Sequence, residues 1–354
     1  MKALLLSIIE EETMAIIKDN AGPKPHITIL ATGGTIASRG GNSLSLTDYG
    51  VSTGRQPVGI DTLMEAVPEM HQFAEISGEQ LFNVGSSKLS IENLLTLAKR
   101  IDVLLSMETI DGVVVTHGTD TLEETAYFLN LVVKSDKPVV LVASMRPATG
   151  LSADGPINLV NAIALASNPS ARNKGVMVCM NDQISSAFGV AKTNTTNVAA
   201  FKCPDTGYLG IMQNFEPFFM SVPVKRHTHQ TEFDVANLAT LPRVDIVYTA
   251  LGTDGLFIDA AVAAGAKGII NSGLGHGNMS AAAMASLEAA RENGVTVVVG
   301  SRTGGGLVTP TQQFMQRDFI TAMMHSAPKS RILLMLALTI TDDPREIQRM
   351  FDQY

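Results

Sequence analysis

Two threonines and one carboxylate stand where their side chains could carry out chemistry. Thr35 comes after the apolar run 27–31 and a pair of glycines, and Thr119 and Asp120 come shortly after a second apolar run, 112–116. A β-branched run bounded by glycine predicts a buried strand, and open α/β sheets bind ligands at the carboxyl ends of their strands. A threonine hydroxyl attacks only when a base or a charged network assists it. We therefore expect the three side chains to converge on one sheet edge.

A helix is predicted directly after the second run. Apolar residues recur at helical spacing over residues 121–133, and Thr121 with Glu124 fits a capping box at the helix start. Asp120 would then lie beside the positive end of the helix, which favours its ionised form.

Four segments together carry a resemblance to a known family. ATGGTIAS (31–38), VVVTHGTDTLEETAYFL (113–129), SMRPATGLSADGPINL (144–159) and KTNTT (192–196) resemble the bacterial L-asparaginase and glutaminase-asparaginase family, type II branch. The resemblance runs from about Ile27 to Tyr354 and includes the matching end RILLMLALTITDDPREIQRMFDQY. It implies hydrolysis of the side-chain amide of L-asparagine, and also of L-glutamine, through an acyl-threonine. It implies no metal, no cofactor, and a homotetramer built as a dimer of close dimers.

The resemblance also implies roles for the catalytic residues. Thr35 is the expected nucleophile, and Tyr49, on a mobile loop spanning about 36–54, activates or orients it. Thr119, Asp120 and Lys192 form a second set that relays protons, because a lysine held near a carboxylate, with its pKa lowered by desolvation, can exchange protons at neutral pH. The simpler interpretations are a turn threonine for Thr35, a surface tyrosine for Tyr49, a helix cap for Asp120 and a solvated charge for Lys192.

Substrate binding is assigned in the same way. Ser86 is expected to hold the substrate's α-carboxylate, although a serine after glycine is also common in turns. Asp120 is expected to bind the α-ammonium group, and the Thr119 backbone N–H faces the developing oxyanion. Asn278 matches a residue that reaches into a neighbouring subunit's site. His117 is expected to be structural.

Two positions depart from the family pattern. Ser87 stands where the family has Gln or Glu, and Gln313 aligns with a glutamate contributed by the neighbouring subunit. Both family residues contact the α-ammonium group, so we expect weaker recognition of it here. A one-residue shift of the alignment would place Gln312 at the second position, which is no better.

Composition excludes several classes of partner. A formal charge of −8 argues against a nucleic acid or an anionic membrane, and no apolar run reaches the length of a membrane helix. The seven histidines show no metal-ligand spacing. The chain has only two cysteines, Cys179 and Cys203, and a poor secretory signal at its start, which favour a cytoplasmic location. The type II resemblance leaves the periplasm as the alternative.

Helical spacing over residues 91–105, 155–167 and 281–292 alternates with strand-like runs such as 244–248. This alternation predicts an α/β fold with two α/β domains, a larger N-terminal parallel-sheet domain and a smaller C-terminal one. We assign residues 1–24 to an N-terminal extension, 25–218 to the catalytic domain, 219–242 to a linker and 243–354 to the second domain, with a helix expected over 259–266.

Two other functions remain open at this point. One is a related ω-amidohydrolase with altered α-amino recognition, and the other is a catalytically silent amino-acid-binding protein. The five intact catalytic positions speak against silence. One methylene separates asparagine from glutamine and changes pocket fit by about 1–3 kcal/mol, so both stay expected substrates.

Overall fold

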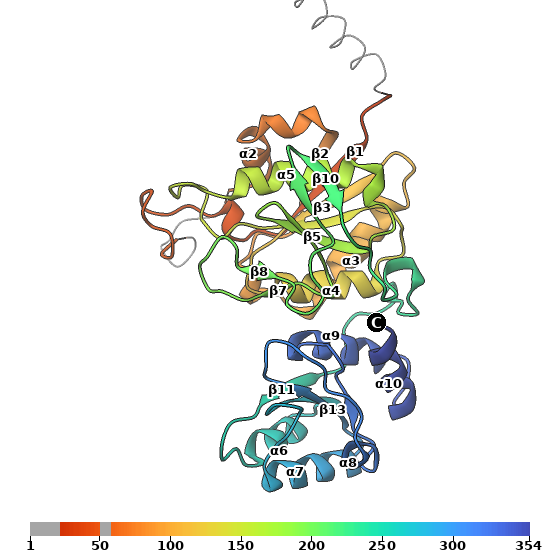
Figure 1. The fold of residues 1–354 in the computed structure, drawn as a ribbon. Coiled ribbons are helices and arrows are strands. Elements are labelled where there is room, and N and C mark those ends of the chain that lie inside the picture. The colour runs from red at the N-terminus through yellow and green to blue at the C-terminus, as the bar shows by residue number, and fades with distance from the viewer. Residues whose placement is uncertain (1–21, 50–57) are drawn as a thin grey trace, which may run out of the picture.

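The computed structural model describes residues 22–49 and 58–354. Figure 1 shows two α/β domains joined end to end, the larger one formed by the N-terminal part of the chain. The predicted extension, 1–24, lies mostly outside the described residues, as does the part of the predicted loop from residue 50 to 54.

The larger domain is built on an eight-stranded sheet with the order β10-β9-β6-β5-β4-β3-β1-β2. Strands β1 to β5 run parallel, whereas β6, β9 and β10 are antiparallel, so the sheet is mixed rather than purely parallel as predicted. Residues 181–182 join β5 to β6 and residues 214–215 join β9 to β10, and such short connections suit antiparallel pairing. The strands are β1 (His26–Ala31), β2 (Glu75–Gln80), β3 (Gly112–Thr116), β4 (Val139–Val142), β5 (Val176–Met180), β6 (Gln183–Ser186), β9 (Gly210–Gln213) and β10 (Glu216–Phe219).

Helices cover both faces of this sheet. Val113 and Val115 of β3 pack into the buried cluster that contains α3 and α4, whereas Val114 between them packs into the cluster that contains α5. A central strand is apolar throughout because both of its faces are buried. The helices are α2 (Ile60–Glu65), α3 (Ile91–Leu105), α4 (Leu122–Val132) and α5 (Gly155–Ser167), and a separate two-stranded ladder joins β7 (Ala191–Lys192) to β8 (Phe201–Lys202).

The smaller domain has a parallel sheet with the order β11-β12-β13-β14. Its elements are β11 (Val244–Tyr248), α6 (Leu256–Ala263), β12 (Gly268–Gly273), α7 (Ala281–Glu292), β13 (Thr296–Ser301), α8 (Gln312–Met315), β14 (Ile320–Thr321), α9 (Ala327–Ala337) and α10 (Pro344–Gln353). Helix α9 packs against α4 where the two domains meet, as Figure 1 shows. Buried residues of α4, α9 and α10 belong to one continuous cluster, so the domains share part of their core.

Two local predictions are wrong. The helix expected over 259–266 is α6, Leu256–Ala263, because the Asp254 side chain accepts a hydrogen bond from the Leu256 N–H and Gly265, at φ +84°, follows the helix end. Thr121 does not cap α4 with its side chain. Its hydroxyl instead donates to the Ser86 carbonyl oxygen at 3.0 Å.

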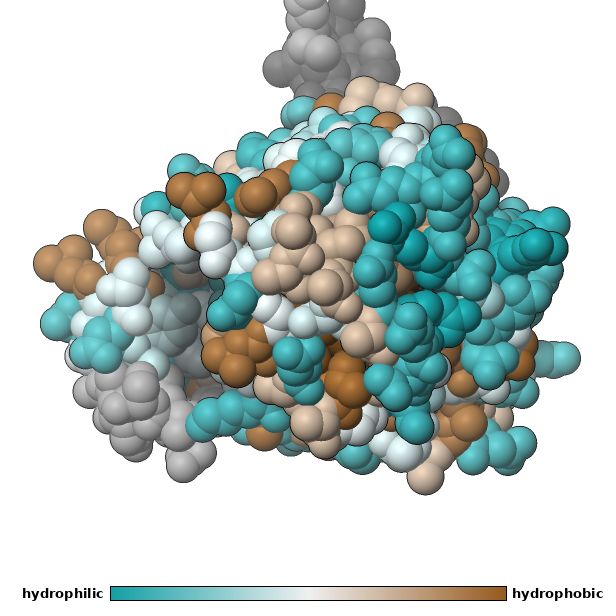
Figure 2. Space-filling view, turned by 90° about the horizontal axis from the view of Figure 1, so that it is seen from below, coloured by the Kyte–Doolittle hydropathy of each residue, from teal (hydrophilic) through white to brown (hydrophobic). Residues whose placement is uncertain are grey.

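Among the described residues, no helix is long and apolar enough to cross a membrane. Figure 2, which views the molecule from below, shows apolar residues interspersed with polar ones. The smaller domain does expose large apolar side chains: Leu251 is 98 %, Leu256 64 % and Phe257 67 % exposed.

Candidate active site

Thr35 lies directly after β1, in a short 3-10 turn (Thr35–Ala37). Gly33 and Gly34 precede it with φ values of +103° and +93°, which other residues rarely adopt. A Cβ atom on Gly34 would lie 2.4 Å from the Gly118 nitrogen. The two loops that follow β1 and β3 therefore touch, which is the convergence expected from the sequence.

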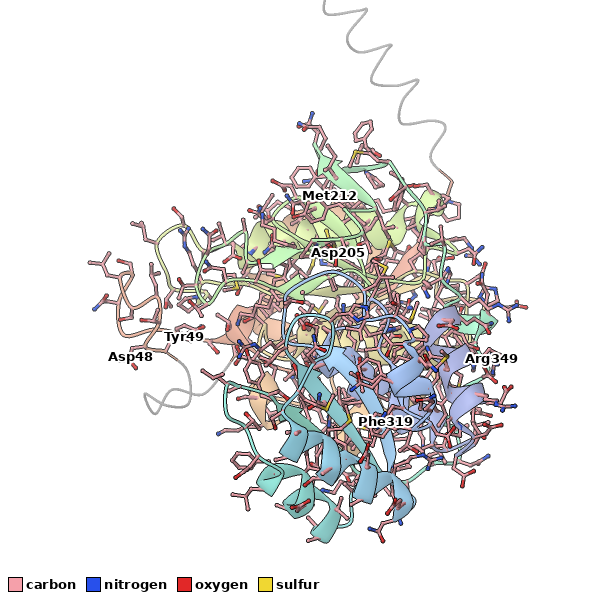
Figure 3. The ribbon with its side chains drawn as sticks, turned by 60° about the horizontal axis from the view of Figure 1, so that its bottom comes forward. Asp48, Tyr49, Asp205, Met212, Phe319 and Arg349 are labelled. Atoms are coloured by element: carbon pink, nitrogen blue, oxygen red, sulfur yellow. The ribbon has the colours of Figure 1, made fainter. Side chains whose placement is uncertain are left out.

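The Thr35 hydroxyl lies 3.1 Å from the Tyr49 hydroxyl. Tyr49 pairs through its backbone with Gly40, in a segment that projects from the side of the larger domain together with Asp48 (Figure 3). Thr35 itself is 9 % exposed, and it lines the cavity described below.

Thr119, Asp120 and Lys192 form a connected group. The Lys192 Nζ donates to Thr119 Oγ1 at 2.9 Å and to Asp120 Oδ1 at 2.8 Å. The Lys192 side chain is 19 % exposed and that of Asp120 is 62 % exposed, so the ion pair opens towards solvent on the carboxylate side. Thr119 and Asp120 come from the loop after β3 and Lys192 from β7, so the fold joins groups more than seventy residues apart.

Ser86 is held next to this group. Its Oγ accepts a hydrogen bond from the Asp120 N–H at 3.1 Å, and its carbonyl oxygen accepts a hydrogen bond from the Thr121 hydroxyl. The loop carrying Ser86 and Ser87 is thus fixed to the start of α4. Ser86 is buried, whereas Ser87 beside it is exposed.

One cavity of about 630 Å³ contains all of these side chains. Two further observations on its lining go beyond the sequence predictions: Lys88, next to Ser87, adds a second ammonium group, and Met145 adds an apolar wall. The sequence feature that could have indicated Lys88 is its place directly after Ser86 and Ser87. The lining residues are Gly34, Thr35, Ser38, Leu46, Thr47, Tyr49, Gly85, Ser86, Ser87, Lys88, Gly118, Thr119, Asp120, Met145, Lys192, Thr195 and Thr196.

His117 is buried and bonded at both ring nitrogens. Nδ1 lies 2.7 Å from the Gly118 carbonyl oxygen, which can only accept, so Nδ1 carries the proton and Nε2 accepts from the Thr125 hydroxyl at 3.0 Å. Burial lowers the pKa of His117 to about 4. The imidazole is therefore neutral at physiological pH and faces away from the cavity lining, as a structural histidine does.

Asn278 and Gln313 lie on the smaller domain, and neither lines the cavity that contains Thr35. Asn278 follows the turn after β12, where its backbone pairs with Leu274, and Gln313 belongs to α8. Both are exposed. This placement leaves both side chains accessible to a second subunit.

Both cysteines are buried and neither forms a disulfide. Over residues 22–49 and 58–354, no group of three or more His, Cys, Asp or Glu side chains is arranged to hold a metal ion.

Comparison with known proteins identifies relatives along nearly the whole chain. Residues 26–224 match the family described as asparaginase, N-terminal, and residues 243–351 match the glutaminase/asparaginase C-terminal domain. L-asparaginase 2 of Bacillus subtilis is 50 % identical over 93 % of this chain and 87 % of its own length. Glutaminase-asparaginase of Pseudomonas fluorescens is 42 % identical over 93 % of this chain and 90 % of its own. A crystal structure from Campylobacter jejuni, described as a probable cytoplasmic L-asparaginase, is 47 % identical, superposes with a TM-score of 0.91, and covers 94 % of this chain and 100 % of its own.

Proposed function

The chain belongs to the asparaginase family, and we propose that it hydrolyses the side-chain amide of L-asparagine to L-aspartate and ammonia. The observation that carries the proposal is the shared cavity, in which the Thr35–Tyr49 hydroxyl pair faces the same space as the Thr119–Lys192–Asp120 group. A binding protein has no need of a nucleophile beside a group that can exchange protons.

The first half of the reaction uses Thr35 as the nucleophile. Its Oγ adds to the amide carbon, the carbon–nitrogen bond breaks, and an ester with Thr35 forms. The proton that Thr35 loses is the one that the leaving nitrogen gains as ammonia. Tyr49, at 3.1 Å, is placed to orient the hydroxyl and to pass this proton on.

The second half hydrolyses the ester. A water molecule adds to the ester carbon and gives one proton back to the Thr35 oxygen as the carboxylic acid leaves. Lys192 and Thr119, joined at 2.9 Å, are the groups that exchange protons with this water. The Thr119 N–H stabilises the oxyanion in both halves, because a backbone donor fixed in place loses no energy to reorganisation.

The charges in the cavity suggest how the rest of the substrate is held. Among the described lining residues, Asp120 is the one carboxylate, whereas Lys88 and Lys192 are both cations. This balance suits the α-carboxylate near Ser86 and Lys88, and leaves Asp120, already paired with Lys192, to meet the α-ammonium group. Because Asp120 is already paired with Lys192, the cavity also supports a second candidate function, that of a related ω-amidohydrolase that does not require an α-ammonium group on its substrate. Ammonia release from L-Asn, D-Asn, L-Gln and succinamate, measured side by side, ranks these substrates.

Thr35→Ala tests the central step. We expect the variant to stay folded and to lose activity on the order of 10³-fold or more, because the attacking group is gone. Thr35→Ser is the matched control, since it keeps a hydroxyl at the same position and should keep much of the activity. Near-normal turnover in Thr35→Ala, with thermal unfolding unchanged, would rule out Thr35 as the nucleophile.

We also propose a homotetramer, a dimer of close dimers, in which Asn278 and the Gln313 region of one subunit complete the site of the next. The exposed apolar side chains of the smaller domain support such a contact, because monomeric surfaces rarely expose large apolar patches. Cytoplasmic location remains our prediction, and the named relatives include the Campylobacter jejuni protein above and a probable periplasmic L-asparaginase of Haemophilus influenzae. Cell fractionation with an ammonia-release assay decides it.

A further inference from the structure

Lys192 sits on a strand that has little support from its own sheet. Strand β7 has two residues and, within the described part of the chain, pairs with only the two residues of β8, outside the eight-stranded sheet. A ladder of this length is marginal in water, so another part of the fold must hold Lys192 in place. Two charged side chains on helices meet this need.

The first is Glu123, in the first turn of α4. Its Oε2 accepts a hydrogen bond from the Lys192 backbone N–H at 2.5 Å. The same helix start carries Thr119 and Asp120 just before it, which receive the Lys192 Nζ. Both ends of Lys192, backbone and ammonium group, are therefore fixed to one short stretch of chain.

The second is Lys329, in the first turn of α9 on the smaller domain. Its Nζ donates to the Phe188 carbonyl oxygen at 2.7 Å and to the Val190 carbonyl oxygen at 2.5 Å. These carbonyls lie in the residues that lead into β7. A side chain of the second domain thus reaches across the domain junction to the segment that carries Lys192.

The position of Lys329 is unfavourable for stability. Its side chain is buried, with 3 % of the residue exposed, and a cation in the first turn of a helix opposes the helix dipole. Burial lowers the pKa of Lys329 to about 8, against the smaller opposing effect of the nearby Glu123. Moving a charged ammonium group out of water into the protein interior costs desolvation energy that its partners repay only in part. A role in placing the segment explains this costly arrangement better than stability does.

We propose that Glu123 and Lys329 are positioning residues that hold β7 so that the Lys192 ammonium group meets Thr119 and Asp120. The smaller domain thereby supports the proton-exchange group of its own subunit. This inference rests on the proposed function, because Lys192 must take part in the reaction for its position to affect turnover.

The experiment compares four variants of the full-length protein. Glu123→Ala removes the acceptor for the Lys192 N–H, whereas Glu123→Gln keeps an oxygen at that place. Lys329→Met removes both carbonyl contacts. Lys137→Met is the matched control, because the Lys137 Nζ likewise donates to two backbone carbonyls, those of Met107 and Ile110, both at 2.7 Å and in another part of the larger domain.

We expect Glu123→Ala and Lys329→Met to lower kcat for L-Asn about 10- to 100-fold, since a misplacement of about 1 Å costs up to that much. KM should change less than the turnover number does. Glu123→Gln should stay close to wild type, and Lys137→Met should lose thermal stability without losing kcat. If Glu123→Ala and Lys329→Met behave like Lys137→Met, the positioning role is wrong.

Amide hydrogen exchange over residues 188–193 gives a second result that does not depend on activity. Exchange there should be faster in Glu123→Ala and Lys329→Met than in wild type, and unchanged in Lys137→Met. Unchanged exchange in the first two variants overturns the proposal even if one of them folds poorly. A wild type that releases no ammonia from L-Asn contradicts the proposed function instead, and the exchange result then still decides whether the two residues hold β7.

Discussion

At the scale of single residues, the cavity offers few partners for a substrate's α-ammonium group. Ser87 is too short to reach it as a glutamine would, and Gln313, if a neighbouring subunit supplies it, brings no charge. Asp120 shares its charge with Lys192 at 2.8 Å. A hydrogen bond to a charged group contributes roughly 1.5–3 kcal/mol, so each lost partner weakens binding about ten- to a hundred-fold.

The double variant Ser87→Gln with Gln313→Glu should therefore lower KM for L-Asn. It should leave succinamate nearly unchanged, because succinamate lacks the ammonium group that the new side chains would meet. Steady-state kinetics on both substrates provide the measurement, and each single variant serves as a control. A wild-type enzyme that already has a micromolar KM for L-Asn and ignores succinamate would contradict this account.

At the scale of elements, the contact between the two threonine loops depends on Gly34. Gly294 is a matched position: its φ is +79°, similar to the +93° of Gly34, but a Cβ there would have nothing within 4 Å. Gly294→Ala carries the cost of a left-handed backbone, roughly 1–2 kcal/mol. Gly34→Ala carries the larger cost of a backbone at φ +93° and ψ −174°, a combination essentially restricted to glycine. Only Gly34→Ala forces a side chain against Gly118.

We expect Gly294→Ala to lower the free energy of unfolding by about that amount and to leave kcat unchanged. Gly34→Ala should lose more stability and, because the loops separate, about 100-fold in kcat. Urea unfolding and ammonia release on the two proteins test this. Equal losses in both variants would show that the loop contact is unimportant.

Much of the element pattern could be predicted from the sequence, because periodicity and capping act locally. Helices α3, α5 and α7 and strand β11 lie at the residues expected for them, 91–105, 155–167, 281–292 and 244–248. The range predicted for α6 extended to residue 266 because the alanines at 264 and 266 have high helix propensity. The helix ends at Ala263 instead, and the chain turns at Gly265. The predicted capping box does not form because of a tertiary contact, in which the Thr121 hydroxyl donates its hydrogen bond to the Ser86 carbonyl oxygen.

The residues of the site also divide into those that the sequence predicted and those that it did not. The motifs predicted several residues that line the cavity within one chain, among them Thr35, Thr119 and Lys192, because each lies at the end of a recognisable strand or inside a matched segment. They missed Glu123 and Lys329, which act through backbone groups distant in sequence. Contacts from a side chain to a remote carbonyl or N–H leave no local pattern of residue types.

At the scale of the whole molecule, the proposed assembly predicts that isolated subunits are inactive. Asn278 and Gln313 lie outside the cavity of their own chain, so a monomer lacks whatever they provide. Activity per chain should fall in proportion to the monomer fraction as the protein is diluted. Light scattering on the assayed samples measures that fraction, and a fully active monomer would contradict the assembly.

Stability of the whole molecule should fall in mild acid. Burial lowers the pKa of His117 to about 4 and that of His325 to about 3, from ordinary values near 6.5. Below pH 6.5 these two histidines bind protons in the unfolded chain but not in the folded one, so the free energy of unfolding decreases as the pH falls towards 4. Each histidine contributes up to about 1.4 kcal/mol per pH unit.

Urea unfolding at pH 5.5 and 4.5, at one protein concentration, measures this slope. His117→Gln removes one of the two groups and should reduce the slope by about 1 kcal/mol per pH unit. The surface histidine variant His71→Gln is the control and should leave it unchanged. An identical slope in wild type and His117→Gln would show that His117 accepts a proton while the protein is folded.

The junction of α4 and α9 also bears on how this protein can be recombined with its relatives. A chimera that takes the larger domain from this chain and the smaller domain from another inherits Glu123 from one parent and the residue at position 329 from the other. The carbonyls of Phe188 and Val190 then meet a side chain selected in a different context. A crossover point in the linker therefore separates Lys329 from the carbonyls that it contacts in the larger domain. Chimera libraries built with such crossovers should be screened for turnover as well as for folding.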